Sequence, residues 1–162
     1  MTIEKIPLSQ FIPTLKVIHI ALIMGQLVFA GVVIFLENNG TAGMARDLGN
    51  IFLFLALIFT GGGIFGSRAF YKYRITFITP DMPFEEKLSN FRIALITKYA
   101  ILEAPSFIAL VGFLITANYL ILLFAGLVVA VFVMEAPTLE KISLELKLSD
   151  EEKILLKSSS IK

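Results

Sequence analysis

The chain has 162 residues, of which 57% are hydrophobic and 17% are charged, and its formal net charge is +1. Soluble domains carry about a quarter charged residues, so this composition indicates an integral membrane protein. The small net charge does not suggest a nucleic-acid partner, and the absence of cysteine excludes disulfides, thiolate metal sites and thiol catalysis.

Four apolar segments make up much of the chain, and each is expected to form a transmembrane helix. About 20 residues of helix cross about 30 Å of hydrocarbon, and a helix pairs its backbone N–H and C=O groups internally. The first segment is too long for a signal peptide and is expected to be an uncleaved anchor. The segments cover residues 17–36, 51–65 with an extension to 70 left open, 99–116 and 119–134.

The basic residues predict the orientation of these segments. Thirteen of the fourteen Lys and Arg residues precede the first segment, lie between the second and third, or follow the fourth. The exception, Arg46, lies between the first and second segments. Because cytoplasmic loops are enriched in Lys and Arg, both termini are expected in the cytoplasm. The expected domains are a four-span transmembrane domain, residues 1–136, and a cytoplasmic polar tail, residues 137–162.

The stretch between the second and third segments carries a helix signal of its own. Pro83 suits the first position of a helix, and Phe84, Leu88, Phe91 and Leu95 then recur at helical spacing. This pattern predicts an amphipathic helix at the membrane interface that continues into the third span.

The tail carries a signal for a further short helix. Ser149 is followed three residues later by Glu152, which is the pattern of a capping box. Residues 142–148 alternate between apolar and polar, so their structure is left open. The expected fold is therefore all-α: a four-helix transmembrane bundle with cytoplasmic termini, an amphipathic interfacial helix before the third span and a short C-terminal helix.

The second segment is rich in glycine, at Gly61, Gly62, Gly63 and Gly66. Small residues let helix backbones approach closely in lipid, so these positions are expected to pack against a neighbouring helix. The alternative is flexibility for gating, or an ion site lined by backbone groups. No Lys-Ser or Lys-Thr pair follows the glycines, so they do not form a phosphate-binding loop.

The tripeptide Glu-Ala-Pro occurs twice, at Glu103 in the third segment and at Glu135 directly after the fourth. These two segments turn near Asn118, and Glu103 lies fifteen residues before it while Glu135 lies seventeen after it. The difference of two residues corresponds to about 3 Å of helix rise. Both carboxylates are therefore expected at similar depth, toward the cytoplasmic side.

His19 in the first segment and Arg68 at the end of the second are expected at comparable depth. Glu103, Glu135, Arg68 and His19 are therefore the candidates for one polar cluster at the cytoplasmic mouth. Three uses of this cluster stay open: ion pairing that holds the helices in register, proton or cation handling, and binding of a ligand or lipid headgroup.

Two further polar features accompany this cluster. Pro105 is expected to kink the third helix, because it deprives the carbonyl of Ile101 of its usual hydrogen bond. Gln26 lies deeper in the first segment and is expected to form an interhelical hydrogen bond.

The runs ILEAPSFIALVGFLITAN and PTLEKISLELKLSDEE resemble those of small four-span bacterial inner-membrane proteins of unassigned function. That resemblance implies an inner-membrane location. The run GGGIFG followed by Glu103 is locally similar to the proton-ring subunits of rotary ATPases, where a Gly-rich helix precedes a helix with a lone carboxylate. The linking segment here, residues 67–98, is far longer than the tight polar loop of that family.

These features favour a structural or accessory role in the membrane, as an oligomer or beside a membrane protein partner. The alternative is a proton or cation transporter or channel component that uses Glu103. No enzyme activity, cofactor or metal is expected, because the chain has one His, no Cys and no clustered His, Asp or Glu motif. The expected partners are membrane lipids, which surround the apolar segments.

Overall fold

The structure, a computed structural model, describes residues 8–159. All regular secondary structure in this range is helical, which confirms the expected all-α class. The elements are α1 (Leu8–Asn38), the short 3-10 helix η1 (Arg46–Leu48), α2 (Gly49–Thr76), α3 (Phe84–Thr116), α4 (Tyr119–Met134), α5 (Leu139–Glu145) and α6 (Asp150–Ser159).

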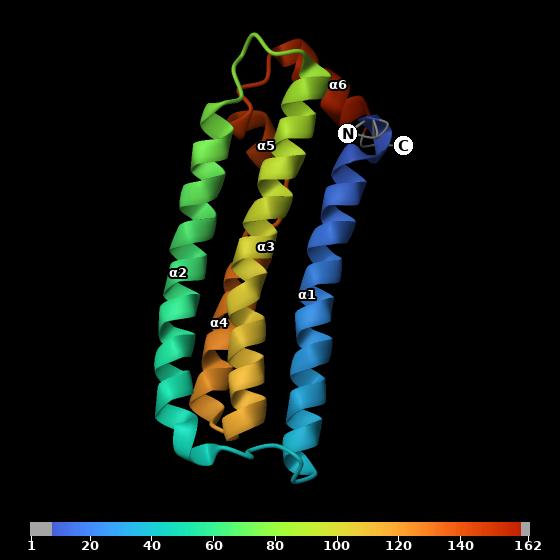
Figure 1. The fold of residues 1–162 in the computed structure, drawn as a ribbon. Coiled ribbons are helices and arrows are strands. Elements are labelled where there is room, and N and C mark those ends of the chain that lie inside the picture. Colours follow the sequence, from blue (N-terminus) through green and yellow to red (C-terminus); the bar gives the residue numbers. More distant parts are fainter. Residues whose placement is uncertain (1–7, 160–162) are drawn as a thin grey trace, which may run out of the picture.

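The four long helices α1 to α4 run side by side, and the short helices α5 and α6 lie at one end of the bundle, where α5 lies beside the end turns of α2 and α3 (Figure 1). This end, here called the tail end, also holds the start of α1 and the connection between α2 and α3. The opposite end, here called the loop end, holds the connections from α1 to α2 and from α3 to α4. As a result, α1 and α3 run parallel, and α2 and α4 run antiparallel to them.

Three helical segments of the described chain are long and apolar enough to cross a membrane. They are Leu8–Asn38, Arg46–Thr76 and Phe84–Thr116. A fourth candidate consists of α4 and α5 together, which are bent by 79° where they meet. These helices are consistent with a membrane protein, and α4 has the bounds that the sequence predicted for the fourth span.

Local sequence explains the ends of α3. The helix begins at Phe84, one residue later than predicted, so Pro83 is the N-cap residue and not the first helical residue. Glu85 and Glu86 lie in the first turn. The carboxylates suit the positive end of the helix dipole. At the other end, Ala117 adopts a left-handed conformation with φ of 52°, and the side chain of Asn118 caps α4 by accepting from the N–H of Leu120 at 3.0 Å.

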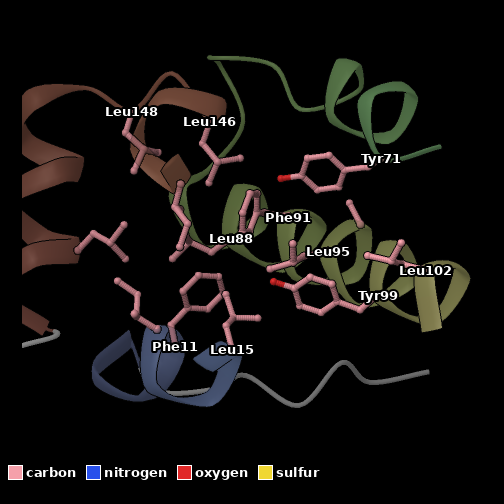
Figure 2. Packing of buried hydrophobic residues seen from close by; sticks show 14 of the residues in the cluster. Phe11, Leu15, Tyr71, Leu88, Phe91, Leu95, Tyr99, Leu102, Leu146 and Leu148 are labelled. Atoms are coloured by element: carbon pink, nitrogen blue, oxygen red, sulfur yellow. The ribbon is translucent and has the colours of Figure 1, made fainter. Parts of the chain in front are cut away.

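The expected amphipathic helix is the first part of α3, which continues without a break into the apolar part. Its apolar side chains Leu88, Phe91 and Leu95 are buried in a core at the tail end, together with Phe11 and Leu15 of α1 (Figure 2). Apolar residues from α5 to α6 complete this core, namely Ile142, Leu146, Leu148 and Leu156. The tail therefore packs against the long helices through buried side chains.

The C-terminal helix predicted from the capping box is present as α6. Glu152 donates its backbone N–H to Ser149 Oγ at 3.2 Å, and Ser149 donates its own N–H to Glu152 Oε2 at 2.8 Å. The other oxygen, Oε1, accepts from the buried Lys87 Nζ of α3 at 2.8 Å. One carboxylate thus caps α6 and joins it to α3.

Candidate functional site

The largest group of charged side chains surrounds Glu135, the C-cap residue of α4. Its Oε2 accepts from Lys98 Nζ of α3 at 2.7 Å and from Lys141 Nζ of α5 at 3.0 Å. Its Oε1 accepts from Arg68 Nε of α2 at 3.3 Å. These four residues, here called the Glu135 cluster, connect α2, α3 and α5 to the end of α4.

The members of the Glu135 cluster differ in exposure, and exposure determines how much each ion pair contributes to the stability of the fold. The side chains of Lys98 and Glu135 are 5% and 12% exposed, whereas those of Lys141 and Arg68 are 39% and 48% exposed. An exposed ion pair contributes about 1 kcal/mol or less. Removing one partner of a buried pair leaves an uncompensated charge and costs far more. Lys98 and Glu135 are therefore the central pair.

Two tyrosines surround this central pair. Tyr99 of α3 donates its hydroxyl hydrogen to the backbone carbonyl of Glu135 at 2.9 Å. Tyr71 of α2 donates to the carboxylate of Glu145, and its ring centroid lies 4.4 Å from Lys98 Nζ. A cation over an aromatic ring is attracted by the ring electrons, so Tyr71 also helps to hold the Lys98 ammonium in place.

The surroundings of Glu135 favour its ionised form. Burial by itself raises the pKa of a carboxyl group, but hydrogen bonds and positive charge from Lys98 and Lys141 outweigh it and lower the pKa of Glu135 to about 2. The carboxylate is therefore charged at neutral pH. A small pocket beside it is lined by both lysines, by Glu135 and Glu145, and by apolar side chains. The two positive charges in this lining are balanced by the two carboxylates.

His19 lies next to the Glu135 cluster but outside it. Its ring centroid is 5.1 Å from that of Tyr99 and 5.4 Å from that of Phe132, and these two rings contact each other at 5.1 Å, so the three rings form one cluster. The imidazole is buried, and Nδ1 has no hydrogen-bond partner among the described residues.

Glu103 lies apart from the other predicted site residues. It is half-buried, and it forms no hydrogen bond or ion pair with any residue from 8 to 159. Residues two positions apart point to nearly opposite sides of a helix. Pro105 contacts α2, so Glu103 is directed away from α2 and from Arg68. The structure thus brings Arg68 and Glu135 together and leaves Glu103 unpaired.

The sequence reasoning did not identify Lys98, Lys141, Tyr71 or Glu145 as site residues. Lys98 carried the clearest signal, because it is the last basic residue before the third apolar segment. A lysine at that depth is in reach of Glu135, which directly follows the fourth segment. Lys141 lies six residues after Glu135, directly before the stretch 142–148 whose sequence pattern does not specify a secondary structure.

Of the four glycines in α2, Gly63 makes the close helix contact. A Cβ atom at this position would lie 2.2 Å from Pro105 Cγ and 3.5 Å from the carbonyl oxygen of Ile101. No atom of the described chain lies within 4 Å of a Cβ built at Gly61, Gly62 or Gly66. The α2–α3 approach is therefore centred on Gly63 and Pro105, and α3 remains helical through the proline.

No group of three or more His, Asp or Glu side chains within residues 8–159 is arranged to hold a metal ion. What the site offers chemically is a carboxylate held by three cations at the tail end and, in the apolar part of α3, the carboxyl group of Glu103, which has no ionic partner among residues 8–159. No protein-family model, curated protein or solved structure matches this chain.

Proposed function

We propose that the chain is a small integral protein of the bacterial inner membrane with a structural or accessory role, acting as an oligomer or beside a membrane protein partner. The observation that supports this proposal best is the Glu135 cluster. In it one carboxylate at the end of α4 binds three cations, one each from α2, α3 and α5. Such an arrangement fixes the relative positions of the helices, because each of the three cations is held by the same carboxylate.

In this proposal α1 to α4 form a four-helix transmembrane bundle in residues 1–136, and the tail end lies in the cytoplasm. The distribution of charge supports this orientation, because thirteen of the fourteen Lys and Arg residues belong to segments on that side. Residues 137–162 form the cytoplasmic tail, whose buried residues Ile142 and Leu156 hold it against the helices.

The experiment is to compare Glu135→Gln with Asp150→Asn. Both changes neutralise a carboxylate, but Asp150 is exposed and its one ion pair within residues 8–159 is with the exposed Lys153. We expect Glu135→Gln to lower thermal stability in lipid nanodiscs and to reduce the amount of protein assembled in the membrane. Asp150→Asn should behave as wild type. Equal stability and assembly of the two variants would remove the support for a structural role of the cluster.

A second candidate function is proton or cation movement through Glu103. The observation that favours it is that Glu103 has no ionic partner within the described chain, although an ionised carboxylate inside a bilayer is costly unless it is paired, protonated or hydrated. The test is flux into proteoliposomes that carry a pH-sensitive dye. Wild type should conduct and Glu103→Gln should not. Equal fluxes in both, or none in wild type, would exclude this second function.

A further inference from the structure

Two ring contacts fix how α1 lies along α3. His19 contacts Tyr99 with ring centroids 5.1 Å apart, and Phe29 contacts Phe107 with centroids 5.5 Å apart. The two helices run in the same direction from the tail end to the loop end (Figure 1). The stretch of α1 between His19 and Phe29 therefore lies along the stretch of α3 between Tyr99 and Phe107.

Glu103 lies midway along this stretch of α3, four residues after Tyr99 and four before Phe107. Residues four apart share a helix side, so Glu103 lies on the side of α3 that contacts α1. Gln26 occupies the matching place on α1, seven residues after His19 and three before Phe29. Measured from the two ring contacts, Glu103 and Gln26 differ in level by about 1.5 to 4.5 Å of helix rise.

The side chain of Gln26 is fully buried, and only one of its two polar atoms forms a hydrogen bond. Its Nε2 donates to the carbonyl of Leu22 in its own helix at 3.4 Å, while its Oε1 has no hydrogen-bond partner among the described residues. A buried carbonyl oxygen without a donor is unfavourable, and nearly all such groups in proteins are paired. Gln26 thus offers a buried, unused acceptor on α1, near the level of Glu103.

None of the nearby charged groups compensates Glu103. The titratable or charged groups of the surrounding helices that lie closest to its level are His19 on α1, Arg68 on α2, Lys98 and Tyr99 on α3, and Glu135 at the end of α4. Arg68 and Lys98 are bound by Glu135, and Tyr99 donates to its carbonyl. His19 has an unpartnered Nδ1 of its own, two helical turns from Gln26 toward the tail end.

We propose that Glu103 and Gln26 form an intramembrane proton-binding site. The carboxylate of Glu103 takes up one proton from water and becomes neutral, and the resulting O–H donates a hydrogen bond to Gln26 Oε1. A protonated carboxyl group is a donor, whereas the ionised form can only accept. Binding one proton therefore removes an unfavourable charge from the apolar region and satisfies the orphaned oxygen of Gln26. The inference deepens the second candidate function and rests on its premise that Glu103 handles protons.

The test is an infrared pH titration of the whole protein in lipid nanodiscs, which follows the carbonyl band of protonated carboxyl groups. Wild type should show a band at pH 7 that Glu103→Gln lacks. Gln26→Leu removes the acceptor and should lower the proton affinity of this group by about threefold to tenfold, the value of one hydrogen bond. Gln26→Met serves as a second variant if the leucine variant does not fold.

Thr60→Val is the matched control, because Thr60 is also buried with an unpartnered hydroxyl but lies in α2, from which Glu103 is directed away. It should leave the titration of Glu103 unchanged. The proposal is overturned if wild type lacks the Glu103-dependent band at pH 7, or if the Gln26 variants titrate as wild type does. A normal titration without proton flux would support the site and exclude only transport. Flux that depends on Glu103 but not on Gln26 would overturn only the site.

Discussion

Lys98 Nζ of α3 lies 2.7 Å from Glu135 Oε2 at the end of α4, and both side chains are almost completely withdrawn from solvent. Only two residues separate the end of α4 from Pro137, so Glu135 lies at the corner where the chain turns into the tail. The buried pair therefore ties this corner to the middle of α3. The first two predictions concern this pair.

Replacing Lys98 by Met should destabilise the protein much more than replacing Lys141 by Met. The first change leaves a buried carboxylate without its closest partner, which costs about 3–5 kcal/mol when no other cation is present. Lys141 and Arg68 remain, so we expect the low end of that range. The exposed Lys141 should contribute about 1 kcal/mol or less. Unfolding in mixed micelles measures both values, and similar values would contradict the ranking by exposure.

The stability of the protein should fall in acid because of Glu135. Its pKa is about 2 in the folded protein, compared with an ordinary value of 4.5. A group whose pKa is lowered by folding contributes stability that is complete above its unfolded pKa and is lost as pH falls toward the folded pKa. The loss should therefore begin near pH 4.5 and continue toward pH 2. Melting temperatures in nanodiscs between pH 7 and pH 2.5 check this, and Glu135→Gln should remove the part of the slope due to this group.

Replacing Gly63 by Ala should force α2 away from α3, because the new Cβ would lie 2.2 Å from Pro105 Cγ. Overpacking of this kind costs about 1–3 kcal/mol. Gly62→Ala, one position away, is the control, since no described atom lies within 4 Å of its Cβ and alanine favours the helix. The changes in the free energy of unfolding of the two variants, relative to wild type, should differ in sign or by more than about 1 kcal/mol. Equal effects would show that the contact is not restrictive.

Replacing Glu152 by Gln should loosen α6. The substitution removes the charge that pairs with the buried Lys87 Nζ and weakens the N-terminal cap of the helix. Amide hydrogens of α6 should then exchange about tenfold faster, which corresponds to about 1.4 kcal/mol for the lost cap and ion pair. Asp150→Asn, in the same turn of α6, should change exchange much less. Hydrogen exchange with mass spectrometry measures both, and unchanged protection in Glu152→Gln would count against the role of this ion pair.

The sequence predicted the helical elements well where composition and caps decide the structure. The bounds of α4 and the capping box of α6 followed directly from apolar length and from Ser149 with Glu152. The helix signal at Leu88 and Phe91 was also correct, although it could not tell that α1 and the tail would bury these side chains. Burial of that kind depends on tertiary contacts, which periodicity does not specify.

The site was harder to predict, because depth along a helix does not determine which side of the helix a residue occupies. Arg68 and Glu135 share both depth and side, and they meet. Glu103 shares the depth, but its position two residues before Pro105 directs it toward α1, since Pro105 contacts α2. The angular position of Glu103 became clear only once the partner of Pro105 was known.

The helices around the perimeter also differ in length. The 16 residues of α4 extend about 24 Å, whereas the 33 residues of α3 extend about 50 Å. Leu123 and Leu127 of α4 are exposed on its outer side, so lipid chains next to α4 meet a shorter apolar surface than the ordinary hydrocarbon thickness of about 30 Å. In the proposed four-span bundle, a bilayer would therefore have to be thinner beside α4 than beside α1, or the protein would have to tilt. A change in bilayer thickness would therefore act on the end of α4, where Glu135 connects this helix to the tail.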